Sequence, residues 1–286
     1  MKPISRTLVA AAFALSPFVV ASGVHAAEEV HWGYEGKEGP KEWGNLKAEW
    51  AVCKTGMKQS PIDLKNAKKA KGEGMDIDWN QTPLKIVNNG HTIQVNYSPE
   101  AHSHSSIDGK EYDLVQFHFH APSEHTVNGK SYPMEVHFVH KNKEGQLAVI
   151  GVFFKEGKAN EALQKIWDNL PGKVGEEKVV AGVTVNGFDL LPPSKAQQGT
   201  EVAIAQAHKK KEGGPLHESE LVPAIATKHF HYEGSLTTPP CAEGVNWSVL
   251  ETPITASKEQ IDKFRSVFKV SNRPVQALHG RQLLEH

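Results

Sequence analysis

The sequence predicts a mostly β (α+β) protein, a single domain with a large central, mainly antiparallel twisted β-sheet and short peripheral helices. Short runs rich in β-branched and aromatic residues recur along the chain between turn residues, whereas only two segments show helical periodicity. No internal repeat and no Ser/Gly-rich linker divides the 286 residues. One domain therefore fits better than two.

The strand-like runs alternate with turn signals such as Asn-Gly, and together they can form one sheet. They lie at residues 84–97, 112–120, 134–142, 147–154 and 245–254. The first helical segment, residues 158–171, is stopped by Pro171, and the second, residues 257–268, starts with Ser257 and Gln260 at capping-box spacing.

Composition and charge describe an ordinary globular protein. Hydrophobic residues make up 38% and charged residues 23% of the chain, and the formal net charge is −1. This balance gives no electrostatic reason to expect nucleic acid or an anionic membrane as a partner.

The N-terminal segment has the pattern of a secretory signal peptide. Lys2 and Arg6 precede an apolar run that is short and broken by Pro17, and small residues lead to an expected cut after Ala26. A membrane anchor is the less favoured alternative because the run is too short to span a bilayer. We therefore expect a signal peptide at residues 1–26 and a periplasmic or secreted protein.

Two further segments are set apart from the expected domain, residues 27–283. Residues 195–228 are polar and rich in lysine, and we expect a surface insertion there whose role the sequence does not indicate. The final residues 284–286 resemble the remnant of an affinity tag and are left out of the fold prediction.

The exported chain would hold two cysteines, Cys53 and Cys241. An even count in an oxidising compartment favours a disulfide, with two buried free thiols as the alternative. Closing so long a loop stabilises the fold by about 5 kcal/mol in the chain-entropy model.

Histidines on two of the expected strands indicate a metal site. Gln116, His118 and His120 alternate along one strand, so they share one face, and Glu135 and His137 share a face of another. The turn signal 128–129 between the two strands places them near each other. If the polar faces coincide, His118, His120 and His137 converge.

Three histidine ligands with a vacant fourth position are typical of a catalytic zinc site. Gln116 and Glu135 each precede a histidine by two residues and offer an acceptor for its second ring nitrogen. A single His-x-His pair is more often an ordinary surface or core feature. Three histidines with two matched acceptors favour the metal.

A jelly-roll metal protein of the cupin type is an alternative. His118, His120, Glu124 and Gly129 approximate the cupin motif, in which Glu124 would bind the metal. The spacing from Glu124 to Gly129 is short for that motif, and the strand of His137 lacks the expected asparagine.

A distant segment, GSLTTPPCAEGVNW at residues 234–247, decides between these two possibilities. Combined with QFHFH, SEHTV and EVHFVH, it resembles the α-class carbonic anhydrases. Further segments similar to that family, in the same order, are HWGY at 31–34, QSPIDL at 59–64, VNNGHT at 87–92, LAVIGVFF at 147–154 and NRPVQAL at 272–278.

The resemblance implies a zinc lyase that hydrates carbon dioxide reversibly to bicarbonate and a proton, by attack of a zinc-bound hydroxide. His118, His120 and His137 would bind Zn²⁺. Thr237 would orient the hydroxide and donate a hydrogen bond to ionised Glu124, which is then not a ligand. The two cysteines match a pair in bacterial members.

The same resemblance implies supporting residues. Gln116, Glu135 and the backbone carbonyl of Ser271 would hold the ligands, although many relatives have asparagine at position 271. His91 would carry the proton to solvent. The substrate pocket would contain Val139, Val149, Leu236, Thr238, Val245 and Trp247, and the waters of the proton path would be ordered by Tyr34, Asn89 and Gln94.

A carbonic-anhydrase-like protein that only binds ligands is a further alternative, but it would be expected to have lost a zinc-binding histidine, and this chain keeps all three. The expected partners are carbon dioxide and bicarbonate, with no nucleic acid and no membrane anchor. The sequence leaves monomer against homodimer open.

Overall fold

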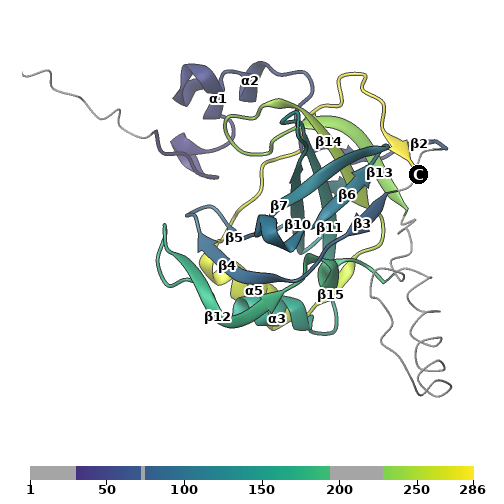
Figure 1. Cartoon of the computed structure of the whole chain (residues 1–286). Helices are drawn as coiled ribbons and strands as arrows, with labels where there is room; N and C mark the ends of the chain where they lie inside the picture. The colour runs from purple at the N-terminus through teal and green to yellow at the C-terminus, as the bar shows by residue number, and fades with distance from the viewer. Residues whose placement is uncertain (1–29, 72–74, 194–227) are drawn as a thin grey trace, which may run out of the picture. The chain divides into compact units, whose positions relative to one another are not determined.

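The strand-like runs form one large mixed sheet at the centre of the protein (Figure 1). The computed structural model describes residues 30–71, 75–193 and 228–286, and the described residues from His31 onward belong to one compact unit. The expected signal peptide, residues 1–26, and all but the last residue of the expected insertion, residues 195–228, lie outside the described residues. No helix in the described ranges is long and apolar enough to cross a membrane.

The main path of the sheet runs β12-β4-β5-β7-β10-β11-β14-β13-β16-β2, with β3, β6 and β15 paired beside it. Most neighbours are antiparallel, as predicted, but β11 pairs in parallel with both β14 and β15, and β16 with β2. The strands are β2 (Lys68–Lys69), β3 (Asp76–Asp78), β4 (Thr82–Asn88), β5 (Ile93–Asn96), β6 (His104–Ile107), β7 (Lys110–His120), β10 (Met134–Lys141), β11 (Leu147–Glu156), β12 (Glu177–Val185), β13 (His229–Ser235), β14 (Glu243–Leu250), β15 (Ile254–Ala256) and β16 (Leu284–Glu285).

The sequence prediction did not include a small second sheet, and it did not locate most of the short peripheral helices. The second sheet contains β1 (Asp63–Leu64), β8 (Thr126–Val127) and β9 (Lys130–Ser131). The short helices are α1 (Trp43–Leu46), α2 (Val52–Thr55), η1 (Gly36–Glu38), η2 (Ala48–Trp50), η3 (Pro99–Ala101) and η4 (Gly187–Leu190). These elements are too short to produce a periodic sequence signal.

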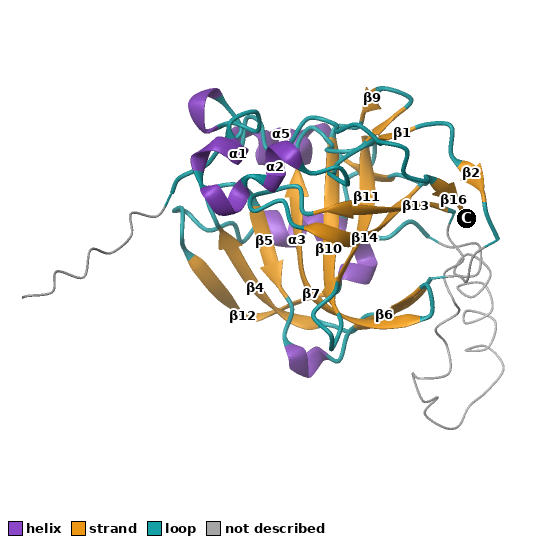
Figure 2. Cartoon of the chain, turned by 90° about the horizontal axis from the view of Figure 1, so that it is seen from above, coloured by secondary structure: helices purple, strands orange, loops and turns teal. Residues whose placement is uncertain are grey.

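Both predicted helices form, and in Figure 2 they lie behind the strands of the sheet. They are α3 (Glu161–Trp167) and α5 (Lys258–Val267), and Ser257 and Gln260 make both hydrogen bonds of the predicted capping box. Trp167 of α3 contacts Phe119 of β7 with ring centroids 4.9 Å apart, and it stacks on Phe264 of α5. The helices thus cover one face of the sheet with an apolar core.

The opposite face of β7 carries the predicted metal-binding histidines. Because side chains alternate along a strand, burying Phe117 and Phe119 in the core turns His118 and His120 to the other face. β7 and β10 are antiparallel neighbours in which His118 lies directly opposite His137, and His120 opposite Glu135. The pairing expected from the turn signal is therefore present, with a register that brings the histidines together.

Residues left out of the fold prediction belong to the sheet. Leu284–Glu285 form β16, which pairs with β13 and β2, and the backbone of His286 exchanges hydrogen bonds with His229. The C-terminal segment therefore adds an inner strand between β13 and the short β2.

The expected disulfide is present between Cys53 of α2 and Cys241, which follows β13. The two Cα atoms are 5.0 Å apart, and both cysteines are buried against Trp43. The amide of Gln59 donates to the Cys241 carbonyl at 3.1 Å. This contact and the bridge fasten the segment after β13 to the N-terminal helices.

We predict that replacing both cysteines by serine lowers the free energy of unfolding by up to about 5 kcal/mol, because the 188-residue separation makes the unfolded loop long. Urea unfolding of the oxidised protein and of the double variant measures the difference. A reductant should destabilise the parent protein and leave the double variant unchanged. Equal stability of the two proteins would contradict the prediction.

Candidate metal centre

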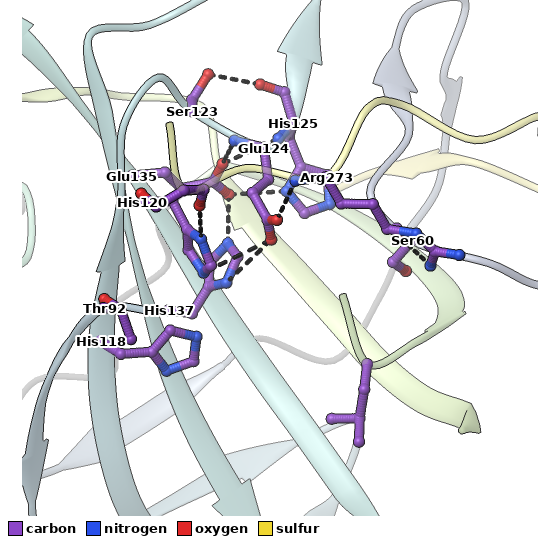
Figure 3. Close-up of polar contacts among 12 residues, drawn as sticks. Ser60, Thr92, His118, His120, Ser123, Glu124, His125, Glu135, His137 and Arg273 are labelled. Atoms are coloured by element: carbon purple, nitrogen blue, oxygen red, sulfur yellow. Dashed lines mark hydrogen bonds and ion pairs between the residues drawn. The ribbon is translucent and has the colours of Figure 1, made fainter. Parts of the chain in front are cut away.

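His118 and His120 of β7 and His137 of β10 point toward one another from adjacent strands (Figure 3). Each offers a ring nitrogen, and these three atoms lie within 4.8 Å of one another. The ring centroids are 5.0 Å apart for His118 and His120, 5.4 Å for His118 and His137, and 4.6 Å for His120 and His137. The predicted ligand set is thus assembled by the sheet itself.

The surroundings keep two of these histidines neutral. Burial lowers the pKa of His118 well below its ordinary value, and repulsion from His120 and His137 lowers it further. The pKa of His120 is also lowered, mainly by burial, although Glu124 opposes the shift. Neutral imidazoles have a free nitrogen lone pair, which is the form that binds a metal.

Hydrogen bonds fix which nitrogen of each β7 histidine is free. His118 Nδ1–H donates to Gln116 Oε1 at 2.8 Å, and His120 Nδ1–H donates to the Ser271 carbonyl at 2.5 Å. Both acceptors were predicted from the sequence or its resemblance. The Nε2 atoms of both rings are therefore left to face the site.

His137 is oriented the other way. Its Nε2 lies 2.9 Å from Glu135 Oε1, in an ion-pair contact that is not aligned as a hydrogen bond, and its Nδ1 lies 3.8 Å from Glu124 Oε2. The predicted acceptor, Glu135, thus contacts its histidine on the side away from the other two ligands. Nδ1 is left as the metal-binding atom.

Glu135 also organises the loop after β7. Its Oε2 accepts from the backbone N–H groups of Glu124 and His125, and its Oε1 accepts from His125 Nδ1 at 2.7 Å. Burial alone raises the pKa of Glu135, but attraction to His125 and His137 and the hydrogen bonds outweigh burial and hold it well below its ordinary value. The carboxylate is therefore an ionised acceptor inside the protein.

His125 is not one of the three predicted ligands, and its contacts give it a structural role. Its Nε2 lies 2.7 Å from the Tyr232 hydroxyl, which donates to Ser60 Oγ at 2.8 Å. Ser60 and Ser235 then exchange two hydrogen bonds between backbone and side chain. No periodic signal in the sequence marks this chain of contacts, which connects Glu135 to the start of the segment holding Thr237.

Glu124 is held close to the ligands by only one of its oxygens. Oε1 accepts from the Arg273 backbone N–H at 2.7 Å, whereas Oε2 is buried without a hydrogen bond, 3.6 Å from His120 Nε2. Thr237 is buried, but the structure has no hydrogen bond between it and Glu124. Glu124 is not part of the three-residue ligand group, unlike in the cupin alternative.

Arg273 is a buried cation that the sequence analysis did not identify. Its guanidinium donates to Gln59 Oε1, the Ser60 carbonyl and the Cys53 carbonyl, at 2.8–2.9 Å. Burial lowers its pKa to about 10, with Glu124 opposing the shift, so it stays charged at neutral pH. Arg273 therefore connects three parts of the structure, which are the helix α2 with its disulfide, the segment at Ser60, and Glu124.

An apolar surface lies beside the histidines, on the same face of the sheet. Val149, Val245 and Trp247 are buried in one cluster, with Val139 and Leu236 partly buried against it. The predicted substrate-pocket residues other than Thr238 thus gather in this cluster, and Thr238 is half-buried next to it in sequence.

Trp247 joins the apolar cluster to the histidines. Its ring meets that of His137 edge-on at 4.9 Å. In the sheet, Val149 lies opposite Val139 on one side and Trp247 on the other. An apolar row therefore crosses β10, β11 and β14 next to the ligand row.

His91 lies in the turn between β4 and β5. Asn89 Oδ1 accepts from the backbone N–H of His91 and of Thr92, both at 2.9 Å, which fixes the turn. The His91 ring is half-buried, and its pKa is lowered by burial and then by the charge of His31. The Gln94 amide donates to Asn96 at 2.6 Å. The side-chain oxygen of Asn89 and the side-chain amide of Gln94 therefore have hydrogen-bond partners within the protein. Their role in ordering the waters of the proton path stays a prediction.

The remaining predicted residue of that path, Tyr34, is half-buried, and its pKa is raised well above its ordinary value, by burial of the hydroxyl and then by Glu124. It contacts Trp32 edge-on, with ring centroids 5.6 Å apart. Tyr34 is thus a neutral hydroxyl at all ordinary pH values.

The donor set fits zinc. Three imidazole nitrogens are the protein ligands of a zinc ion that keeps its fourth position open. His120 Nε2 and Glu124 Oε2 are both buried without a partner, which is costly unless something binds there. A bound metal would satisfy His120 Nε2, whereas Glu124 Oε2 is left able to accept a hydrogen bond.

The family model for eukaryotic-type carbonic anhydrase matches residues 38–201 and 197–286. A carbonic anhydrase from Pectobacterium carotovorum is 39% identical over 266 residues, covering 93% of this chain and 95% of that protein. The structure of a hyperthermostable carbonic anhydrase from a hydrothermal vent chimney has a TM-score of 0.74 at 46% identity, covering 89% of this chain and 99% of that one. The structure of the α-carbonic anhydrase from Thermovibrio ammonificans, in complex with sulfanilamide, has a TM-score of 0.74 at 40% identity. The match covers 90% of this chain and 100% of that one.

We predict that Gln116→Ala weakens zinc binding by about 10-fold or more, because His118 loses the acceptor that orients it. Competition with a chromophoric chelator measures the affinity. Gln94→Ala is the matched control, since Gln94 lies directly opposite His118 on the neighbouring strand and is hydrogen-bonded elsewhere. Equal zinc affinity of the Gln116 variant and the parent protein would contradict the assignment.

Proposed function

The chain belongs to the eukaryotic-type carbonic anhydrase family, and we propose that it performs the family's hydration of carbon dioxide with zinc held by His118, His120 and His137. The reaction converts CO₂ and water to bicarbonate and a proton, and it is reversible. The observation that carries the proposal is the convergence of the three histidines beside an apolar surface.

Zinc, when bound, supplies a Lewis acid that lowers the pKa of a water ligand to about 7, a magnitude for which carbonic anhydrase itself is the standard example. The protein must then hold three imidazoles in a fixed orientation. Gln116, Ser271 and Glu135 contact the rings from behind and would orient them in this way.

Glu124 and Thr237 are proposed to orient the nucleophile. Glu124 Oε2 has no hydrogen bond and so can accept one from the Thr237 hydroxyl. Because that hydroxyl would already donate its hydrogen to Glu124, it could only accept a hydrogen bond from the nucleophile. The O–H of the nucleophile would then point toward Thr237, and its lone pair would point toward the carbon of CO₂. The Arg273 N–H keeps Glu124 in place by its other oxygen.

The apolar row Val139, Val149 and Trp247 is proposed to receive carbon dioxide. The substrate has no charge, so an apolar wall next to the ligands binds it without competing for hydrogen bonds. The same wall keeps bulk water from the reacting carbon.

His91 is proposed to carry the product proton to solvent. An imidazole titrates near neutral pH and so can accept and release a proton in each cycle. The half-buried position of His91 in the turn between β4 and β5 gives it access to both the protein and the solvent.

We also propose that the protein is exported to the periplasm or secreted after cleavage of residues 1–26. The disulfide between Cys53 and Cys241 supports this, because such bridges persist in oxidising compartments.

The proposal is tested by zinc analysis and CO₂ hydration at neutral pH, with His118→Ala beside the parent protein. We expect stoichiometric zinc and activity in the parent. In the variant kcat/KM should fall by more than about 100-fold, since losing a ligand costs more than losing the partner behind it.

His104→Ala is the matched control, because His104 lies on β6 and not in the ligand group. It should retain both zinc and activity. Full activity of His118→Ala, or a parent protein that binds zinc without hydrating CO₂, would contradict the proposal.

A further inference from the structure

A second group of histidines lies where β13 and β16 run side by side (Figure 2). His229 and His231 alternate along β13, so they share one face, and the backbone of His286 exchanges hydrogen bonds with that of His229. The ring of His286 stacks on His229 with centroids 5.1 Å apart and meets His231 at 5.8 Å. We call these three residues the β13–β16 histidines.

The pair His231 and His286 resembles a pair of the predicted zinc ligands in its geometry. Its ring planes are nearly perpendicular, at 83°, as are those of His118 and His137, at 88°. Its centroid separation of 5.8 Å is only slightly wider than the 5.4 Å of that pair. A small rotation of one ring would therefore let both imidazoles reach one ion.

The β13–β16 histidines are separate from the predicted zinc site. Tyr232 points to the face of β13 that holds His125, so its neighbour His231 points to the opposite face. The strand pairing agrees, because His231 lies opposite Ser248 of β14, whereas Tyr232 lies opposite Trp247. The sheet thus lies between the two groups of histidines.

Several buried polar atoms around this pair have no hydrogen-bond partner in the part of the chain that the structure describes. They are His231 Nδ1, both ring nitrogens of His286, Ser248 Oγ and Asn246 Oδ1. Buried polar atoms are rarely left unpaired, and a group of them indicates a bound water or ion. Two imidazoles in the group favour a transition-metal ion, because imidazole is a preferred ligand of Zn²⁺, Cu²⁺ and Ni²⁺.

A carboxylate lies behind His231. Asp108 Oδ2 is at ion-pair distance from His231 Nε2, 3.6 Å, and the Asn246 amide donates to the same oxygen at 2.9 Å. A ring that turns Nε2–H to a carboxylate keeps the lone pair of Nδ1 free, which is the usual support of a metal-binding histidine. The nitrogen left free here, His231 Nδ1, is one of the unpaired atoms.

The pair is also accessible. His231 lines a surface pocket of about 200 Å³ together with Lys110, Tyr112 and Asn246. Its side chain is 20% exposed, whereas His229, on which His286 stacks, is buried. An ion can therefore enter from the solvent while the His286 ring is held from the protein side.

We propose that His231 and His286 bind a divalent transition-metal ion between β13 and β16, with Asp108 and His229 orienting the two rings. The remaining coordination positions would be filled by water, to which Ser248 and Asn246 offer oxygen atoms. The site goes beyond the proposed function, because it uses no residue of the zinc site or of the proton path. Its effect would be to join β16 to β13, the strand that leads to Thr237.

The test titrates Cu²⁺ into the full chain after the predicted zinc site has been filled with Zn²⁺. Copper is the probe because its EPR spectrum reports how many nitrogens are bound to it. We expect one tight copper site with two imidazole nitrogens. His286→Ala and His231→Asn should each weaken it by at least about 100-fold, and Asp108→Asn by about 10-fold, since losing a ligand costs more than losing the partner behind it.

His102→Asn is the matched control, because His102 is an exposed histidine outside this group, and it should leave the copper affinity unchanged. His31→Asn tests another pair of neighbouring rings, His31 and His91, whose centroids are 6.2 Å apart. Copper that is lost from His31→Asn but kept by His286→Ala would place the ion at that pair and overturn the proposal.

Thermal unfolding gives a second readout. One equivalent of Cu²⁺ should raise the Tm of the zinc-loaded parent and not that of His286→Ala, because only the folded parent presents both rings to the ion. The variant keeps the backbone hydrogen bonds to His229, so it should fold and hydrate CO₂ at the parent rate. Failure of this site and failure of the proposed function are therefore separate results.

Two outcomes would show an adventitious ion only and overturn the proposal. One is an EPR spectrum with fewer than two imidazole nitrogens. The other is equal copper affinity in the parent, His286→Ala and His231→Asn.

Discussion

The pairing register of β7 with β10 is the constraint on which the rest of the site depends. It sets His118 opposite His137 and His120 opposite Glu135. Because side chains alternate, a slip of one residue would move His118 and His120 to the core face and Phe117 and Phe119 to the site. Phe119 is buried against α3 and α5 and Phe117 against Phe138, which opposes such a slip, so the apolar core fixes the position of the polar site. Gly151 of β11 lies opposite His137 on the other side, and a Cβ there would approach Glu135 Oε1 to 3.0 Å.

Two buried charges support the ligand strands from behind. Glu135 is fully buried and ionised, and its four contacts spread over His137, His125 and two backbone N–H groups. Arg273 is buried on the other side of Glu124 and donates to three oxygen acceptors. Burying a charge is costly unless it has hydrogen-bond partners, so both groups constrain the segments that supply those partners. Two of the Arg273 acceptors are the carbonyls of Ser60 and Cys53. Ser60 is hydrogen-bonded to Ser235, and Cys53 forms the disulfide with Cys241, so both acceptors belong to segments that hold the part of the chain containing Thr237.

The sequence predicted most of this arrangement because its signals are periodic. Alternation along β7 and β10 predicted the three histidines and two of their acceptors, Gln116 and Glu135, and the capping box predicted the start of α5. The family resemblance supplied Ser271, Glu124 and Thr237. Ser271 contacts His120 and Glu124 contacts Arg273, in each case more than a hundred residues away along the chain. Local patterns could not predict Arg273, the His125–Tyr232–Ser60 chain or the stacking of His91 on Trp32, because each depends on tertiary contacts. The predicted hydrogen bond from Thr237 to Glu124 is absent from the structure, which leaves Glu124 Oε2 as an acceptor without a donor.

The most direct test of the account is X-ray absorption at the zinc edge of the purified, zinc-loaded protein. The register of β7 and β10 predicts three imidazole nitrogens and one non-protein oxygen at about 2.0 Å, in a four-coordinate site. A carboxylate bound in place of a histidine, or only two imidazoles, would contradict the assignment of His118, His120 and His137 as the ligands.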